Sequence, residues 1–384
     1  MVRTMKGASL QNANRNSALS ALAMAAGLPG DVLLYLLLPL YASDFGLSLP
    51  EVGMLLAANR LVRIVGYGHV AKFYAERGDR PTLTWALIAA TCCCIVYATL
   101  SGFWLLIGAR LVWGLCYGAF NLSNQALAVA EIEGAARRAG ISRALAALGP
   151  MVALPLGAWL TLEWGPRAIF IVAALGALGG LFASRSLPVL PRRMEVPKIR
   201  RFTMPTGLDV WAFIEGTVLD GLFVIGLTYL AKSSGVESPL FAAAMLMSSR
   251  YLTEILLSPA GGHAASRWGA ERVLLVLSLS TAVALVAFGT GWLMVGATAI
   301  LALRALQLPL LPVIVARRFP GPARVEALVA RSLWRDLGGG VGPLVAGVVL
   351  PIWSPTLIYT VAAALLAMSA VMAVMPARVR ALVP

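Results

Sequence analysis

The sequence has few charged residues, few cysteines and few histidines. Charged side chains make up 12% of the 384 residues, whereas soluble globular domains average about 25%. The four cysteines lack the spacing of a zinc site, and two isolated histidines argue against a metal centre. Because 59% of the residues are hydrophobic and the mean hydropathy is +0.83, the composition indicates a membrane protein rather than a soluble one.

Apolar stretches long enough to cross a bilayer recur along the whole chain. A helix of about 20 residues spans the hydrocarbon core, and lipid offers the backbone no hydrogen-bond partners, which excludes open strands. We expect twelve spans, near residues 18–42, 51–71, 82–101, 104–127, 141–163, 167–187, 208–231, 238–260, 272–290, 293–316, 333–352 and 356–376. The sequence therefore predicts an all-α membrane protein.

The positive charge follows the topology of these spans. The formal net charge is +14, from 31 Lys and Arg against 17 Asp and Glu. Most of the basic residues outside the spans lie on one side of the membrane if both termini are cytoplasmic, as inside-positive topology requires. We therefore expect a multi-pass protein of a bacterial inner membrane and no nucleic-acid partner.

The two halves of the chain resemble each other at an offset of about 190 residues. "GLPGDVLLYLLLPLYASDFG" (27–46) aligns Asp31 with Asp220 in "GTVLDGLFVIGLTYLAKSSG" (216–235), and further on Arg110 aligns with Arg304. The basic and apolar start resembles a secretion signal, but its counterpart in the second half places it in the mature fold. We expect an N-terminal six-helix bundle (1–187), a cytoplasmic linker (188–207) and a C-terminal six-helix bundle (208–384).

Short motifs between and within the spans repeat with the same period. "GGHAASRWGAER" (261–272) contains Gly262, Ser266, Arg267, Gly269 and Arg272, and the matching first-half loop contains Glu76, Arg77, Gly78 and Arg80. Together these motifs resemble the loop signature of the major facilitator superfamily, and the resemblance covers essentially the whole chain. It implies two pseudo-symmetric six-helix bundles, related by an axis along the membrane normal, that move a solute by alternating access.

Three further patterns are similar to those of this superfamily. Arg110 is followed by Gly114 in span 4, and Gly140 precedes Gly149-Pro150 in span 5 as in exporters of the family. "DVLLYLLLP" (31–39) resembles a first-span pattern of proton-driven exporters. Gly149-Pro150 and its counterpart Gly342-Pro343 interrupt spans 5 and 11, where a bend either shapes the gates or fixes helix packing.

Charged residues inside spans are costly in lipid and therefore face a bundle interior or a wet cavity. We expect Asp31 in span 1 to couple transport to protons, with Arg60 or Arg110 as its partner; the alternative is a static ion pair that fixes packing. Asp220 and Glu215 offer a second carboxylate site, but five residues set them about 140° apart on an α-helix, so both cannot face one cavity centrally.

Arginines outnumber acids in the spans, which favours an anionic substrate. Arg60 and Arg250, at equivalent depths of spans 2 and 8, are candidates to clamp an anion. Glu254, one turn from Arg250, either neutralises it or binds substrate. Asn121 and the guanidinium groups of Arg110 and Arg304 complete the residues predicted to line the cavity.

The leading functional hypothesis is a secondary active transporter that exports a small organic solute in exchange for protons. Uptake or exchange of an anionic or carboxylate solute, and a receptor that binds without transport, remain alternatives. An enzyme is not expected, because the sequence contains no Gly-x-Ser-x-Gly or His/Glu ligand spacing and no nucleotide-binding Gly-Lys-Ser/Thr loop. We expect no cofactor and no metal, and we expect a monomer.

Overall fold

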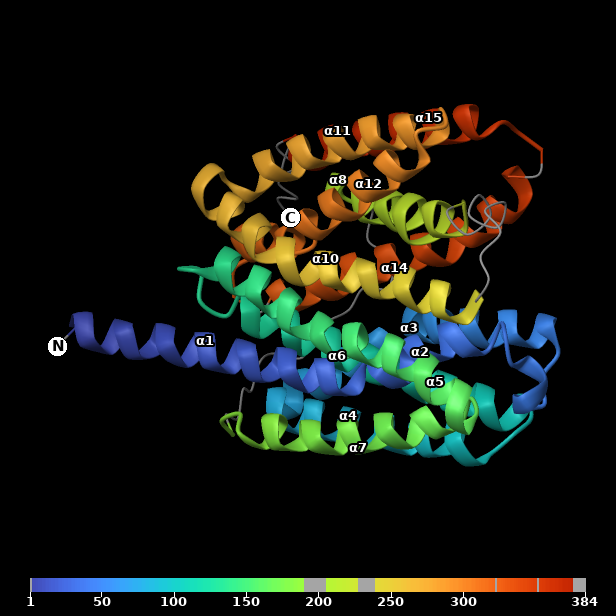
Figure 1. Ribbon diagram of the computed structural model, residues 1–384. Coiled ribbons are helices and arrows are strands. Elements are labelled where there is room, and N and C mark those ends of the chain that lie inside the picture. Colours follow the sequence, from blue (N-terminus) through green and yellow to red (C-terminus); the bar gives the residue numbers. More distant parts are fainter. Residues whose placement is uncertain (1, 190–204, 227–238, 322, 351, 376–384) are drawn as a thin grey trace.

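The computed structural model describes residues 2–189, 205–226, 239–321, 323–350 and 352–375. Its described residues form helices joined by short turns (Figure 1). The N-terminal half contains α1 (Val2–Gly27), α2 (Pro29–Leu37), a short 3-10 helix η1 (Ala42–Phe45), α3 (Leu49–Arg77), α4 (Asp79–Thr99), α5 (Phe103–Ala128), α6 (Ala135–Trp164) and α7 (Ala168–Arg185). The predicted span 1 corresponds to the end of α1 followed by α2.

The C-terminal half repeats this order. It contains α8 (Gly207–Glu215), the π-helix η2 (Gly216–Leu222), α10 (Pro239–Trp268), α11 (Ala270–Gly289), α12 (Leu293–Gln307), α13 (Leu310–Arg318), α14 (Ala323–Val349) and α15 (Pro355–Val374). Spans 7 and 10 therefore each consist of two consecutive helical segments. The twelve-span all-α architecture is confirmed, whereas most of the predicted linker, residues 190–204, lies outside the described residues.

Within the described residues, eight helical segments are long and apolar enough to cross a membrane by length and composition alone. They are Leu10–Leu37, Asp79–Thr99, Phe103–Ala128, Ala135–Trp164, Ala168–Arg185, Ala270–Gly289, Leu293–Arg318 and Pro355–Val374. The remaining spans are 2, 7, 8 and 11, formed by α3, by α8 with η2, by α10 and by α14. These four spans carry most of the charged residues that the sequence places inside the membrane, which lowers their hydropathy. Many of those charged residues belong to the candidate site described below.

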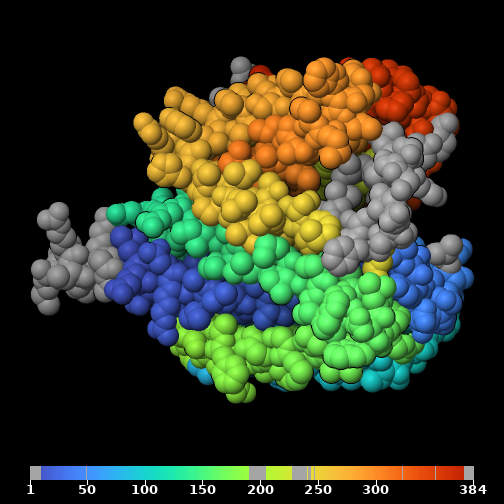
Figure 2. Space-filling view, in the orientation of Figure 1, coloured from blue at the N-terminus to red at the C-terminus, as the bar shows by residue number. Residues whose placement is uncertain are grey.

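The two bundles lie one against the other, with α6 and α10 side by side at their boundary (Figures 1 and 2). Small residues allow this close approach. A Cβ on Gly262 of α10 would overlap the carbonyl oxygen of Ala136 in α6, and a Cβ on Gly140 would overlap the backbone at Ser258. Helix–helix interfaces in lipid are typically lined by such small residues.

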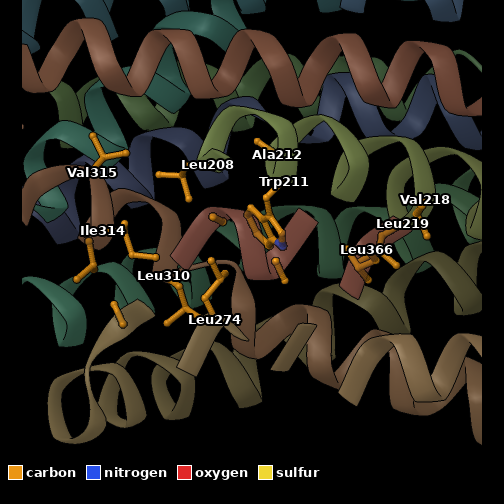
Figure 3. Packing of buried hydrophobic residues seen from close by; sticks show 14 of the residues in the cluster. Leu208, Trp211, Ala212, Val218, Leu219, Leu274, Leu310, Ile314, Val315 and Leu366 are labelled. Carbon is orange, nitrogen blue, oxygen red and sulfur yellow. The ribbon is translucent and has the colours of Figure 1, made fainter. Parts of the chain in front are cut away.

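Two clusters of buried hydrophobic residues form the core, one mostly from the C-terminal half and one mostly from the N-terminal half, and each includes residues of the other half. In the C-terminal half, Trp211 of α8 packs among Leu208, Leu274 and Leu310 (Figure 3), and its indole nitrogen donates to Ser278 Oγ at 3.1 Å. Large apolar side chains also cover the outside of the molecule; Trp104 is 82% exposed and Met294 is 80% exposed. In a membrane protein such residues face lipid, so the apolar exterior fits the twelve-span assignment.

The signature segments that the sequence predicted as loops are largely helical. Gly262 and Arg267 lie within α10 and Arg272 lies in α11, so the prediction of a loop over 261–272 is wrong except at Gly269. Gly78 and Gly269, with φ angles of 79° and 88°, each form the tight link between two long helices. Glycine suits these positions because other residues rarely adopt positive φ.

The Gly-Pro pairs do not interrupt their helices, contrary to the prediction. α6 continues through Pro150 and α14 continues through Pro343. Their glycines instead permit close packing, because a Cβ on Gly149 would overlap the carbonyl oxygen of Ala25 in span 1. A Cβ on Gly342 would likewise overlap the carbonyl oxygen of Thr217 in span 7, so equivalent glycines bring spans 5 and 11 against spans 1 and 7.

Candidate functional site

Asp31 and Arg110 form a buried ion pair within the N-terminal half. The Arg110 guanidinium donates to Asp31 Oδ1, and Asn59 Nδ2 donates to the same oxygen at 2.9 Å. Arg110 is 0% exposed and Asp31 is 8% exposed. Of the two partners that the sequence offered, the structure selects Arg110, while Asn59 was not predicted.

Arg60, the other predicted partner of Asp31, points to the opposite half. Its guanidinium donates to the carbonyl oxygen of Gly339 in α14. Asn59 and Arg60 are neighbours on α3, so their side chains leave the helix about 100° apart. That divergence explains why Asn59 contacts the first span and Arg60 contacts the eleventh.

The C-terminal half contains an equivalent pair. Arg304 of α12 donates to Asp220 Oδ1 in η2, and these two residues align with Arg110 and Asp31 in the internal repeat. The Arg304 side chain is 4% exposed and that of Asp220 is 14% exposed. Each half thus contains an equivalent carboxylate–guanidinium pair between its first and fourth spans.

Glu215 and Asp220 lie on one side of span 7, which corrects the expected angle of about 140°. Arg335 of α14 contacts both, with Nε–Oε2 of Glu215 at 3.0 Å and Nη2–Oδ2 of Asp220 at 3.3 Å. Arg304 also lies 3.7 Å from Glu215. The reason is the π-helix over Gly216–Leu222, in which hydrogen bonds join residues five apart and a five-residue step completes roughly one turn.

Arg250 and Glu254 extend this group towards the N-terminal half. Arg250 lies 3.5 Å from Asp220 and 3.6 Å from Glu254, so the expected pairing within the helix is present. Glu254 also accepts a hydrogen bond at 3.3 Å from Arg143 of α6, in the other half. Both arginines of the predicted anion clamp, Arg60 and Arg250, thus contact protein groups in this conformation.

Other polar contacts join the two halves, and the sequence did not reveal them. Arg63 Nη1 lies 2.9 Å from Asp336 Oδ1, and the Tyr67 hydroxyl donates to the other carboxylate oxygen at 2.9 Å. Asn121, which was predicted to line the cavity, donates to Ser332 Oγ at 3.3 Å. No spacing along the sequence relates a residue of span 2 to its partner in span 11. The sequence therefore indicated Arg63 and Asp336 only as charged residues inside spans and did not show that they pair.

The inter-half contacts reach the end of the bundle that the sequence predicts as cytoplasmic. Arg324 of α14 donates to the carbonyl oxygen of Val129 at 2.6 Å. The Arg324 contact and the Gly262–Ala136 packing hold the two halves together at this end. At the same end Glu76, next to Arg77, lies 4.0 Å from Lys72, and this pair stays within α3.

The described residues contain no group of three or more His, Cys, Asp or Glu side chains suited to a metal ion. Cys92, Cys93, Cys94 and Cys116 are free thiols, and all but Cys92 are buried. The site is therefore a network of arginines and carboxylates at the centre of the bundle. Asp31 is buried and Asp220, Arg60 and Arg250 are half-buried, and each of the four contacts a group on another span.

Structural comparisons place this architecture among known transporters. The human organic anion transporter MFSD10 superposes with a TM-score of 0.72 at 20% identity, covering 94% of this chain and 98% of that chain. The proton:xylose symporter XylE gives 0.75 at 12% identity with 95% of each chain covered, and the E. coli fucose:proton symporter FucP gives 0.72 at 14% identity with 95% and 98% covered. At such low identity these likenesses show the fold.

Sequence comparison identifies the family. No curated protein sequence matches the chain. The family model described as Major Facilitator Superfamily matches twice, over residues 18–230 and 208–382. Because the matches span nearly the whole chain and the fold agrees, the protein belongs to the major facilitator superfamily of membrane transporters.

Proposed function

We propose that the protein is a secondary active transporter that exports a small organic solute in exchange for protons. The observation that carries the proposal is the buried Asp31–Arg110 pair at the centre of the N-terminal half. The span 1 and span 5 motifs support export. XylE and FucP, which share the fold, are proton symporters by their names, and this supports protons as the coupling ion.

The proposed coupling follows from the burial of Arg110. When Asp31 takes up a proton, the Arg110 guanidinium loses its counter-charge while it remains fully buried. An unpaired buried charge costs on the order of 3–5 kcal/mol. Arg110 therefore needs a new partner or water, which requires movement of α2, α3 or α5. Asp31 lies on α2 and Arg110 on α5, and Leu55 and Asn59 of α3 contact the pair. Proton uptake thereby drives the change in access.

The remaining features of the proposal concern organisation and location. We propose that residues 1–187 and 208–384 act as two rocking bundles joined by the 188–207 linker. The protein functions as a monomer in a bacterial inner membrane with both termini in the cytoplasm. Glu76, Arg77, Arg267 and Arg272, at the proposed cytoplasmic helix ends, contribute to gating together with the close glycine contacts.

The decisive experiment is gradient-driven transport in proteoliposomes. A solute that raises the thermal stability of the purified protein is first found by screening compound classes. Proton antiport predicts that this solute accumulates in vesicles with an acidic lumen and a neutral exterior. Accumulation only with the opposite gradient would establish symport and overturn the exporter assignment.

Asp31→Asn tests the coupling residue. The amide keeps the size of the side chain but takes up no proton, so we expect loss of gradient-driven accumulation while exchange of labelled for unlabelled solute without a gradient continues. Asp44→Asn, on the exposed helix η1, is the matched control and keeps both activities. Wild-type accumulation by Asp31→Asn would contradict the proposed role of this carboxylate.

A further inference from the structure

The charged groups around Asp220 form a larger cluster than those around Asp31, and they are not balanced. This C-terminal charge cluster consists of the guanidinium groups of Arg60, Arg143, Arg250, Arg304 and Arg335 and the carboxylates of Glu215, Asp220 and Glu254. Five positive groups face three negative ones. The cluster thus carries two positive charges in excess.

The excess comes from Arg60 and Arg143, which the N-terminal half supplies. The three carboxylates of the C-terminal half face three guanidinium groups of the same half, those of Arg250, Arg304 and Arg335. In the internal repeat, the shift that aligns Asp31 with Asp220 places Ala26 opposite Glu215, and the shift that aligns Gly149-Pro150 with Gly342-Pro343 places Ser142 opposite Arg335. The Asp31–Arg110 pair therefore has no counterparts of Glu215 and Arg335 and is balanced one to one. The Asp220–Arg304 pair stands in the field of several guanidinium groups.

Unused hydrogen-bond donors lie in the same cluster. The Nε atoms of Arg143, Arg250 and Arg304 are buried and make no hydrogen bond. Those of Arg250 and Arg304 have a carboxylate oxygen at 3.6 Å and 3.7 Å, beyond hydrogen-bond distance, from Glu254 and Glu215 respectively. The three guanidinium groups are linked through shared carboxylates, because Glu254 contacts Arg143 and Arg250 while Asp220 contacts Arg250 and Arg304. Buried donors without a close acceptor are costly, so these positions favour an anionic ligand.

The excess positive charge and the buried donors both favour an anionic ligand. An anion at this position neutralises the excess charge and accepts from the free N–H groups, and guanidinium groups bind planar carboxylates in a fork geometry. Such a ligand contacts Arg143 of the N-terminal half and Arg250 and Arg304 of the C-terminal half. A ligand held by both halves is placed to change their relative stability in each access state.

From this we infer that the C-terminal charge cluster is a substrate subsite for a small organic dianion of the dicarboxylate class. The inference rests on the proposed function in that it names the solute. It assigns different tasks to the two repeats: the balanced Asp31–Arg110 pair exchanges a proton, and the unbalanced Asp220–Arg304 surroundings bind the anion.

Matched small molecules test the charge of the ligand directly. Succinate, succinamate and succinamide have nearly the same size and shape and carry two, one and no negative charges at neutral pH. At equal ionic strength we expect the melting temperature of the purified protein to rise most with succinate, less with succinamate and not at all with succinamide, in a concentration-dependent manner. Malonate and glutarate vary the spacing between the two carboxylates.

Variants locate the site. Arg304→Gln removes one charge and one free donor, and we expect it to weaken the apparent affinity for succinate by about tenfold or more. The Arg304 side chain is only 4% exposed, so its loss can impair folding. Arg250→Gln is therefore the second variant, because the Arg250 side chain is 33% exposed. Arg185→Gln, at the exposed end of α7, removes the same charge elsewhere and should bind as the wild type does.

Several outcomes would overturn the inference. A dianion subsite here would be excluded if succinate, succinamate and succinamide stabilised the protein equally, or if none of malonate, succinate and glutarate stabilised it. Undiminished succinate binding in both Arg304→Gln and Arg250→Gln would exclude it as well. These results are distinguishable from failure of the proposed function, because proton-driven transport of a neutral solute would leave that function intact. Conversely, dianion binding with no proton dependence of transport would remove the proton coupling and keep the subsite.

Discussion

The ion pair between Arg63 and Asp336 allows the attraction between the two halves to be measured. The side chains are 6% and 15% exposed, and their nearest atoms lie 2.9 Å apart. Arg63 also lies over the Tyr117 ring, 4.4 Å from its centroid. Asp336→Asn is the chosen perturbation, because the amide oxygen still accepts from Tyr67 while the negative charge is lost.

The expected magnitude follows from burial. Removing one partner of a buried pair leaves an uncompensated charge and costs about 3–5 kcal/mol. The partial exposure of Asp336 and the aromatic ring beside Arg63 reduce this penalty, so we expect a loss near the lower limit, about 3 kcal/mol. Arg63→Gln should cost a similar amount. The double variant buries no charge and should recover about 2 kcal/mol of the summed losses.

Two measurements check this prediction. Unfolding of the four proteins in detergent gives the coupling free energy of the cycle, and hydrogen exchange over α3 and α14 reports separation of the halves. Since 1.4 kcal/mol corresponds to a tenfold change in an equilibrium, losing 3 kcal/mol from this conformation shifts its population by roughly a hundredfold. Additive single losses, or unchanged exchange in Asp336→Asn, would refute the argument that this pair holds the halves together.

Two further predictions concern the helices around the site. Gly149→Ala should destabilise the protein by about 1–3 kcal/mol in thermal unfolding, since its Cβ overlaps the Ala25 carbonyl oxygen; Gly347→Ala, whose Cβ meets nothing, should be neutral or stabilising. Deletion of Thr217 should convert η2 into α-helix and leave Glu215 and Asp220 four residues apart on one face. We expect retained stability and a lower transport rate, and full transport activity would show that the π-helix is dispensable.

The sequence predicts the fold because the bilayer imposes a fixed length on each span. Spans 9 and 10, separated near Gly291, were predicted by hydropathy alone. Their bounds lie within a few residues of α11 and of α12 together with α13. The repeat also predicted the equivalence of Asp31 with Asp220 and of Arg110 with Arg304. Those features depend on spacing along one chain, which the sequence records directly.

The details of the candidate site depend on geometry that the sequence does not record. The predicted angle between Glu215 and Asp220 was wrong because it assumed α-helical turns, whereas all four residues between them belong to a π-helix. Hydrophobic periodicity does not signal such a change. The Gly149-Pro150 and Gly342-Pro343 pairs suggested bends, but the close contacts of their glycines decide their structural role, and those contacts involve other spans.

The repeat also explains how two related bundles attract each other. The shift that aligns Gly149 with Gly342 places Arg143 opposite Asp336, and both residues form ion pairs across the boundary, with Glu254 and Arg63 respectively. The N-terminal half supplies the guanidinium in both pairs and the C-terminal half supplies the carboxylate.

Duplicated bundles with identical charges at these positions would place like charges on both surfaces and repel. Here the equivalent positions carry opposite charges, Arg143 in one half and Asp336 in the other. The facing surfaces of the two halves are therefore complementary where α3 meets α14 and where α6 meets α10. Because these pairs lie next to Arg60 and Arg250, the same groups that hold the halves together border the charge cluster. An anion that competes for Arg143 therefore weakens one boundary as it binds, which links occupancy of the site to relative movement of the bundles.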